Sequence, residues 1–424
     1  MKIRHTAGLA ALVTVGVALA GCTAAETPSS GDGTVSGTLT GVFDSNYKGM
    51  LDEIIANFEK KYPDVKVDIN YQGGSDIANL ISTQLQAGTA PDLLLTYPGG
   101  EPGPGGSANV VTLASQGALL DLSSSEWAGQ VPDVWASDVG YEGKIYAYPG
   151  AVQPLAAIYN QDELDALGLT IPTTLDEVYD LCAAATKAGI YAYSQGLGEV
   201  TAGPQMLSFA QTSTLVYGPT PDFKAQLDAG TTTYQDSPWV GQFQVYKDMY
   251  DKGCFGDGAL GRTRQQGAEA VAAGQALAQV DVGGQKVIME GIAKDGNFVV
   301  APIPATNDGT TYVTALPGYT VAANAKAKNK AAAVAFMDFL AEPDQSVIYA
   351  NAFSAVPIIP NDAFTAPASL APFSDAVAAG NYAKLANLGN PTVQTTLNEV
   401  VQSLLLGNDT PKSAAEKLQT AFEG

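Results

Sequence analysis

Histidine is almost absent from this chain of 424 residues, which contains one, His5, near its start. This scarcity excludes catalysis by a Ser-His-Asp or Cys-His arrangement, because both need an imidazole base. It also removes the commonest protein ligand for zinc, copper and iron. An enzyme built on this chain would have to depend on carboxylates, lysine or tyrosine. We therefore expect no zinc or iron site. We also expect no catalytic residues and no cofactor.

Basic residues are also scarce, with 21 Lys and Arg against 43 Asp and Glu. The formal charge of −22 becomes −24 if Lys2 and Arg4 are lost with a signal segment. A chain of this charge is a poor partner for nucleic acid or anionic lipid, since both are bound by clusters of Lys and Arg. The acidic residues are scattered, which is typical of a solvated surface. About 400 residues are too many for one compact unit, so we expect two lobes.

Long apolar runs are missing after the first segment. The run from Leu9 to Ala20 follows a basic start and is too short to span a bilayer comfortably. The residues Leu19 to Cys22 resemble a lipobox, whose cysteine becomes the lipidated first residue of a bacterial lipoprotein. We expect a lipoprotein signal peptide over 1–22 and a flexible tether over 23–37. The protein would then be exported and held at the outer face of the cytoplasmic membrane only by the lipid on Cys22. The alternative is an ordinary cleaved signal with an incidental cysteine.

Only two further cysteines are present, Cys182 and Cys254. In an exported chain a pair of cysteines favours a disulfide. The alternative is two buried free thiols, because Cys182 falls on an apolar helical stripe with Leu175, Val178 and Ala185.

The segment from Thr38 to Tyr97 has the pattern of a βαβαβ unit. Two amphipathic helices are predicted from apolar side chains at helical spacing: Leu51, Ile54, Ile55, Phe58 and Tyr62 in the first, and Ile77, Leu80, Ile81 and Leu85 in the second. Between them, alternation over residues 65–70 predicts a half-buried strand, and residues 93–95 form a short apolar strand. Such units build parallel sheets, which bind ligands at the carboxyl ends of their strands.

Three stretches of the chain carry a family resemblance. Residues 47–71 and 79–97 resemble the opening of an extracellular solute-binding protein of the ABC-transporter type, in the branch that mostly binds sugars. Residues 141–181 resemble the passage from the first lobe to the second, and residues 316–361 a later crossover. Within residues 141–181 the matching residues are Gly143, Tyr146, Pro149, Tyr159, Asn160, Leu167, Gly168, Pro172, Thr174 and Glu177. Thr174 and Glu177 also have the spacing of a capping box.

The resemblance implies an α/β fold of the periplasmic-binding-protein type II, with two α/β lobes joined by a three-segment hinge and a ligand cleft between them. We expect lobe 1 over 38–151 and 316–355, and lobe 2 over 152–315 and 356–424. Such a protein closes on its ligand and presents it to the transmembrane subunits of an ABC permease, without transforming it. We expect a monomer that captures a mono- or oligosaccharide.

A sugar site needs flat apolar ring faces and polar groups that match pairs of hydroxyls. By position after predicted strands and at the crossovers, we expect nine ligand contacts: Asp44, Ser45, Asn46, Tyr97, Tyr148, Gln153, Gln205, Gln285 and Tyr319. At Gln285 the family often has Trp, so one stacking ring is missing here. Each aromatic could instead be an ordinary core or surface ring, and Asp44 could cap the first helix.

Two other functions remain open at this point. A receptor for polyamines or another small polar solute would line its cleft with several acidic residues, whereas only Asp44 is acidic among the expected contacts. A secreted glycosidase would need two carboxylates facing each other about 5–10 Å apart, and nothing in the sequence pairs them.

The loop over 98–106, rich in Gly and Pro, follows the carboxyl end of a strand. It could overhang the cleft or form a passive surface loop.

Overall fold

The computed structural model describes residues 35–100, 108–199, 203–385, 388 and 390–424. Val35 to Gly424 belong to one unit, and two large sheets within it form the two lobes. The signal peptide over 1–22, the lipidated Cys22, the tether up to residue 34 and most of the loop over 98–106 lie outside the described residues. Within the described residues, none of the helices combines the length and apolar character needed to cross a membrane.

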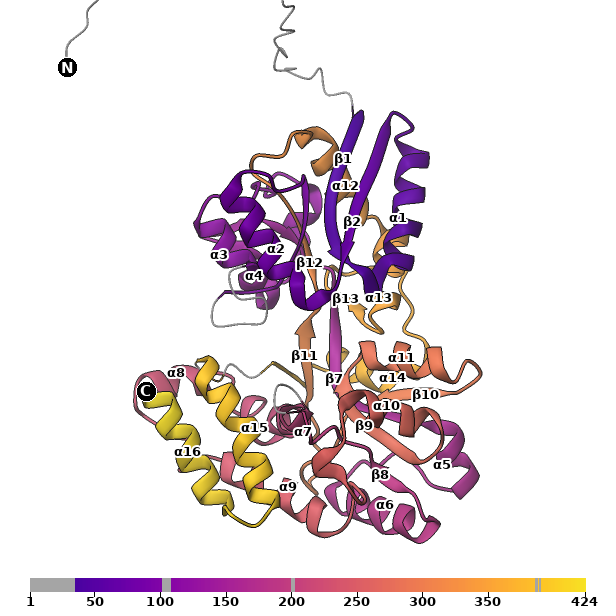
Figure 1. Ribbon diagram of the computed structural model, residues 1–424, viewed down its shortest axis with the longest axis vertical. Helices are drawn as coiled ribbons and strands as arrows, with labels where there is room; N and C mark the ends of the chain where they lie inside the picture. The colour runs from indigo at the N-terminus through magenta and orange to yellow at the C-terminus, as the bar shows by residue number, and fades with distance from the viewer. Residues whose placement is uncertain (1–34, 101–107, 200–202, 386–387, 389) are drawn as a thin grey trace, which may run out of the picture. The chain divides into compact units, whose positions relative to one another are not determined.

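The first sheet is built around the predicted βαβαβ unit. Its strand order is β2-β1-β3-β12-β6, and β1 is parallel to both β2 and β3. The helix α1 lies alongside β2 (Figure 1) and buries Leu51, Ile54 and Phe58, as the helical spacing predicts. The elements of this part are β1 (Gly37–Asp44), η1 (Ser45–Tyr47), α1 (Lys48–Lys61), β2 (Val65–Gln72), α2 (Gly74–Ala87), β3 (Leu93–Thr96), α3 (Val110–Ser115), η3 (Glu126–Gln130), α4 (Asp133–Val139), β4 (Gly140–Tyr141), β5 (Lys144–Ile145), β6 (Ala147–Tyr148), β12 (Thr320–Ala323), α12 (Lys330–Leu340) and α13 (Pro343–Ala352).

The second sheet has the order β14-β11-β7-β9-β8, with β10 and β13 also paired to the long strand β7. Among its helices, α7 is buried along its whole length, and α15 packs beside α16 (Figure 1). Its elements are β7 (Ala151–Asn160), α5 (Gln161–Leu167), α6 (Leu175–Ala188), β8 (Tyr191–Tyr193), α7 (Gly203–Thr212), the π-helix η4 (Ser213–Tyr217), α8 (Phe223–Asp228), α9 (Trp239–Asp251), η5 (Ala259–Gly261), α10 (Arg264–Ala272), β9 (Ala276–Val282), α11 (Gly284–Ile292), β10 (Phe298–Ala301), β11 (Val313–Pro317), β13 (Val356–Pro357), η6 (Ala368–Leu370), α14 (Ala371–Ala378), β14 (Tyr382–Lys384), α15 (Pro391–Leu405) and α16 (Pro411–Glu423).

Three crossovers join the two sheets and lie next to one another. The chain leaves β6 of the first sheet and enters β7 of the second at Pro149 and Gly150, and it returns from β11 to β12 through Gly318 and Tyr319. The third crossover, over residues 353–355, leads from α13 to β13. At the start of β7, Val152 pairs with β11 on one edge and with β13 on the other (Figure 1). The predicted lobe boundaries stay predictions. The strand β11 belongs to the second sheet through Pro317.

Two local features support the second sheet. Thr174 begins α6 with a capping box, in which its hydroxyl accepts from the backbone N–H of Glu177 and the Glu177 carboxylate accepts from the Thr174 backbone, as predicted. A disulfide joins Cys182 in α6 to Cys254 after α9, and both residues are fully buried. The bond thus connects two helical segments that pack in one hydrophobic cluster.

Candidate functional site

The carboxylate of Asp44 ends β1 and is the acceptor at the centre of the candidate site. It is buried, and its Oδ1 accepts a hydrogen bond of 2.9 Å from the backbone N–H of Asn46. Asp44 is therefore an N-cap, but of the short helix η1 and not of α1. Its Oδ2 accepts a second hydrogen bond, of 3.2 Å, from the hydroxyl of Tyr319 in the second crossover. One carboxylate thus holds a strand end of the first sheet against the hinge.

Aromatic rings surround this carboxylate. We call Tyr47, Tyr97, Tyr319 and Phe353 the aromatic cluster. The ring of Tyr319 meets Tyr97 edge-on at a centroid distance of 5.2 Å and Tyr47 at 5.7 Å. Tyr47 stacks on Phe353 at 4.1 Å, with an angle of 22° between the planes. Four chain segments meet here, since Tyr47 follows β1, Tyr97 follows β3, Tyr319 joins β11 to β12 and Phe353 follows α13.

The tyrosines of the cluster are held in their neutral form. Burial raises the pKa of Tyr47 to about 12, and the negative charge of Asp44 adds to the shift. The pKa of Tyr97 and that of Tyr319 are also raised, again mainly by burial. At neutral pH the three phenol groups can therefore both donate and accept hydrogen bonds. The carboxylate of Asp44 accepts in both of the hydrogen bonds described above. Such a set matches the hydroxyl groups of a ligand, and a carboxylate beside aromatic rings also matches a cation.

The end of β9 brings a second group of expected contacts close to the cluster. A Cβ on Gly284 would lie 3.6 Å from the Tyr47 hydroxyl, and one on Gly283 would lie 2.9 Å from Pro154 and 3.0 Å from the Phe353 carbonyl oxygen. Gln285 follows directly and is buried, and its Oε1 has no hydrogen-bond partner within the described residues. The structure therefore places Gln285, and Gln153 next to Pro154, near the cluster.

The other expected contacts are distributed as follows. Ser45 and Asn46 are exposed in η1, beside Asp44. Tyr148 is in the core of the first sheet, where its ring packs edge-on against Trp127 and Tyr349. Gln205 is buried in α7, and its backbone N–H donates to Asn398 of α15. The structure does not bring Tyr148 or Gln205 into the cluster.

Sequence reasoning missed two members of the cluster. Tyr47 directly follows the expected contacts Asp44 to Asn46, so a wider window after the first strand would have included it. Phe353 lies just before the third crossover and gave no separate signal. Tyr349, one helical turn earlier, stacks on Phe353 and donates from its hydroxyl to the Tyr319 carbonyl at 2.7 Å. The cluster therefore rests on a second layer from α13.

A cavity of about 1140 Å³ lies elsewhere on the first sheet. It is lined by β1, β2, the end of α2 and the loops at 116–118 and 324–328, and it contains no residue of the aromatic cluster. Its lining side chains include Thr40, Asp68, Leu85 and Lys326 but no aromatic ring. Because a sugar site needs ring faces, the cluster at the hinge is the better candidate.

Two α/β sheets joined by three adjacent crossovers, with aromatic and polar side chains gathered at the junction, define a two-lobed binding protein. The bacterial extracellular solute-binding protein family matches residues 43–347, and this chain belongs to that family. The family and the expected fold class are thereby confirmed.

Alignments with similar proteins extend over most of this chain. The melibiose/raffinose/stachyose-binding protein MelE of Bacillus subtilis is 26% identical over 317 residues, which cover 71% of this chain and 69% of MelE. A maltooligosaccharide ABC transporter solute-binding lipoprotein of Streptococcus pneumoniae is 24% identical over 377 residues, covering 84% and 80%. Among solved structures, RafE in complex with raffinose has a TM-score of 0.74 at 17% identity, covering 91% of this chain and 99% of RafE. At that identity the structural match shows the fold.

Proposed function

We propose that this protein is the extracellular substrate-binding component of an ABC importer and captures a mono- or oligosaccharide. The single observation that carries the proposal is the aromatic cluster around Asp44 at the junction of the two sheets. The membership of the chain in a solute-binding family supports it, as do relatives named for melibiose, raffinose, stachyose and maltooligosaccharides.

The chemistry of the cluster matches that of a sugar. The C–H face of a pyranose packs on a tyrosine or phenylalanine ring, and its hydroxyls pair with groups that donate, accept or do both. Asp44 supplies an acceptor, Gln285 an amide, and Tyr97 and Tyr319 neutral hydroxyls. We propose Asp44, Tyr97, Gln153, Gln285 and Tyr319 as ligand contacts. We also propose Ser45 and Asn46, which follow β1, as ligand contacts, and we add Tyr47 to them.

Ligand capture would work by closure about the three crossovers. A saccharide that touches groups from both sheets binds the closed arrangement more tightly, and this difference in affinity drives closure. The closed form would then deliver the sugar unchanged to the permease, so the protein would not act as an enzyme. We also propose that residues 1–22 direct export, that the lipid on Cys22 anchors the protein outside the cytoplasmic membrane, and that it acts as a monomer.

A thermal-shift screen tests this function. The panel holds raffinose, stachyose, maltotriose, chitotriose, spermidine and putrescine, and each sugar is recovered and analysed afterwards. A ligand at 100 times its dissociation constant adds about 2.7 kcal/mol to the free energy of unfolding. We expect a shift with a saccharide that is recovered intact. Stabilisation by polyamines alone would replace the sugar with a polyamine, and consumption of the sugar would make the protein a hydrolase.

A matched pair of variants locates the site. Tyr97→Leu should weaken binding of the saccharide about tenfold or more, because it removes a ring and a hydroxyl from the cluster. Tyr179→Leu is the control, since Tyr179 lies on α6 under the Lys252 ammonium and outside the cluster. Equal loss of affinity in both variants would argue against a site at the cluster.

A further inference from the structure

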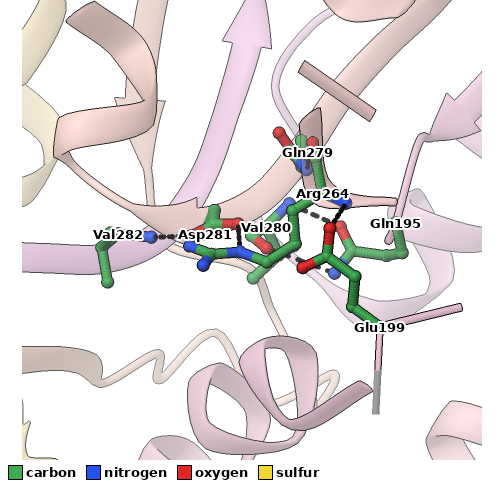
Figure 2. Close-up of polar contacts among 7 residues, drawn as sticks. All are labelled: Gln195, Glu199, Arg264, Gln279, Val280, Asp281 and Val282. Atoms are coloured by element: carbon green, nitrogen blue, oxygen red, sulfur yellow. Dashed lines mark hydrogen bonds and ion pairs between the residues drawn. The ribbon is translucent and has the colours of Figure 1, made fainter. Parts of the chain in front are cut away.

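An arginine is fixed at the edge of the second sheet that faces the junction. Arg264 begins α10, and its Nε donates to Oδ2 of Asp281 at 2.8 Å while its Nη2 donates to Oδ1 (Figure 2). The side chain of Asp281 is 1% exposed and that of Arg264 is 26% exposed. The carboxylate is therefore enclosed, while part of the Arg264 side chain reaches the surface of the protein.

The surrounding residues hold this pair in one orientation. The backbone N–H of Arg264 donates to the Glu199 carboxylate at 2.8 Å (Figure 2). The side-chain amide of Gln195 bonds both backbone groups of Val280. It accepts from the N–H at 2.7 Å and donates to the carbonyl at 3.2 Å. Gln195 and Glu199 follow β8, and Val280 is in β9. Because the two strands are parallel, these groups share the carboxyl edge of the sheet, where such sheets bind ligands.

This edge continues directly into the aromatic cluster. Asp281 is three residues before Gly284, and a Cβ on Gly284 would lie 3.6 Å from the Tyr47 hydroxyl. The strand β9 ends at Val282, and the next backbone N–H, that of Gly283, donates to the Pro154 carbonyl at 2.8 Å, so two steps of chain, about 7 Å, separate Asp281 from the hinge. A saccharide that stacks on the cluster can therefore extend along the end of β9 as far as Arg264.

The charged groups around Arg264 determine which sugars can bind beside it. Burial works against its charged form, but the hydrogen bonds and negative charge of Asp281 outweigh that effect, so its pKa is raised. The guanidinium stays charged, yet Asp281 neutralises it and Glu199 adds a further negative charge nearby. An arginine has five N–H donors, and the bonds described for this side chain use one on Nε and one on Nη2. The remaining donors suit hydroxyl oxygens, whereas a carboxylate on the ligand would be repelled.

We propose that Arg264 is a specificity-determining residue that donates to the hydroxyls of a neutral saccharide, and that Asp281 is the positioning residue that makes the site reject acidic sugars. The inference rests on the proposed function, because it assigns a substrate class to the same site.

Calorimetric titration of the full-length protein with raffinose, maltotriose and digalacturonate tests it. Arg264→Lys keeps a cation beside Asp281 but loses the planar guanidinium group and its several N–H donors. We therefore expect about 10- to 100-fold weaker binding of the neutral sugar. Arg262→Lys is the matched control, because Arg262 donates to the carbonyls of Phe255 and Asp257 and stacks over Tyr191. Its affinity should equal that of wild type. Circular dichroism confirms that each variant is folded.

Asp281→Asn gives a readout that a merely structural role would not produce. Removing the neutralising charge should raise the affinity for digalacturonate relative to the neutral sugar by about tenfold. If wild type binds a neutral sugar but Arg264→Lys binds it equally well, or Asp281→Asn leaves the preference unchanged, the inference is wrong and the proposed function stands. If wild type binds no saccharide at all, both are wrong.

Discussion

Removal of the disulfide gives the prediction whose magnitude follows most directly from the structure. Cys182 and Cys254 are 72 residues apart in sequence, and their Cα atoms are 4.7 Å apart. A cross-link that closes a loop of this length lowers the entropy of the unfolded chain, which in the chain-entropy model stabilises the folded protein by about 4.4 kcal/mol. The double variant Cys182→Ala/Cys254→Ala should be less stable by about that amount.

The expected shift is within reach of ordinary measurements. For a folded unit of this size, 4.4 kcal/mol corresponds to a decrease in Tm of about 5 °C. Urea unfolding of the wild type, of the double variant and of the wild type under reducing conditions provides the comparison, and the last two should agree. Saccharide affinity should not change, because both cysteines are buried in the hydrophobic cluster of the second sheet, which contains none of the aromatic cluster. A loss of stability below about 1 kcal/mol would refute the reasoning, since the bond would then not restrict the unfolded chain.

Four further substitutions test the fold by urea unfolding. Thr174→Ala removes the N-cap of α6 and should cost about 1 kcal/mol, and an unchanged stability would contradict the capping box. Gly143→Ala should cost about 1 kcal/mol for its positive φ of 76° alone, whereas Gly150→Ala should cost about 3 kcal/mol, because its Cβ would also lie 2.8 Å from the Tyr349 ring. Equal costs would show that the first crossover is not tightly packed. Burial opposes the charge of Asp409, but hydrogen bonds led by that of Lys417 lower its pKa. Asp409→Asn should therefore cost about 1 kcal/mol at pH 7, and the difference should disappear as the pH falls below about 4 and through the lowered pKa, so a constant difference would be inconsistent.

Local patterns predicted those parts of the fold that depend on neighbouring residues. The stripe of Leu51, Ile54 and Phe58 predicted α1 and its buried face, and the alternation over 65–70 predicted β2. The capping box at Thr174 was predicted from two residues only three positions apart. In each case the information lies within one or two turns of chain, where periodicity and capping act.

The candidate site depends on contacts that sequence spacing does not carry. Asp44 and Tyr319 meet across 275 positions, and Tyr47 stacks on Phe353 from the other end of the chain. Arg264 looks like an ordinary helix-start residue until β9 places Asp281 against it. Tyr148 was expected as a ligand contact because it lies next to a crossover, whereas its ring packs in the core. In all four cases tertiary packing, and not the local sequence, determines what the side chain contacts.

The decisive experiment is a crystal structure of the protein with the saccharide that stabilises it most. We expect density for the sugar against the rings of Tyr97 and Tyr319, with hydrogen bonds to Asp44 and Gln285. Sugar bound instead in the cavity beside α2, or away from the junction of the two sheets, would contradict it.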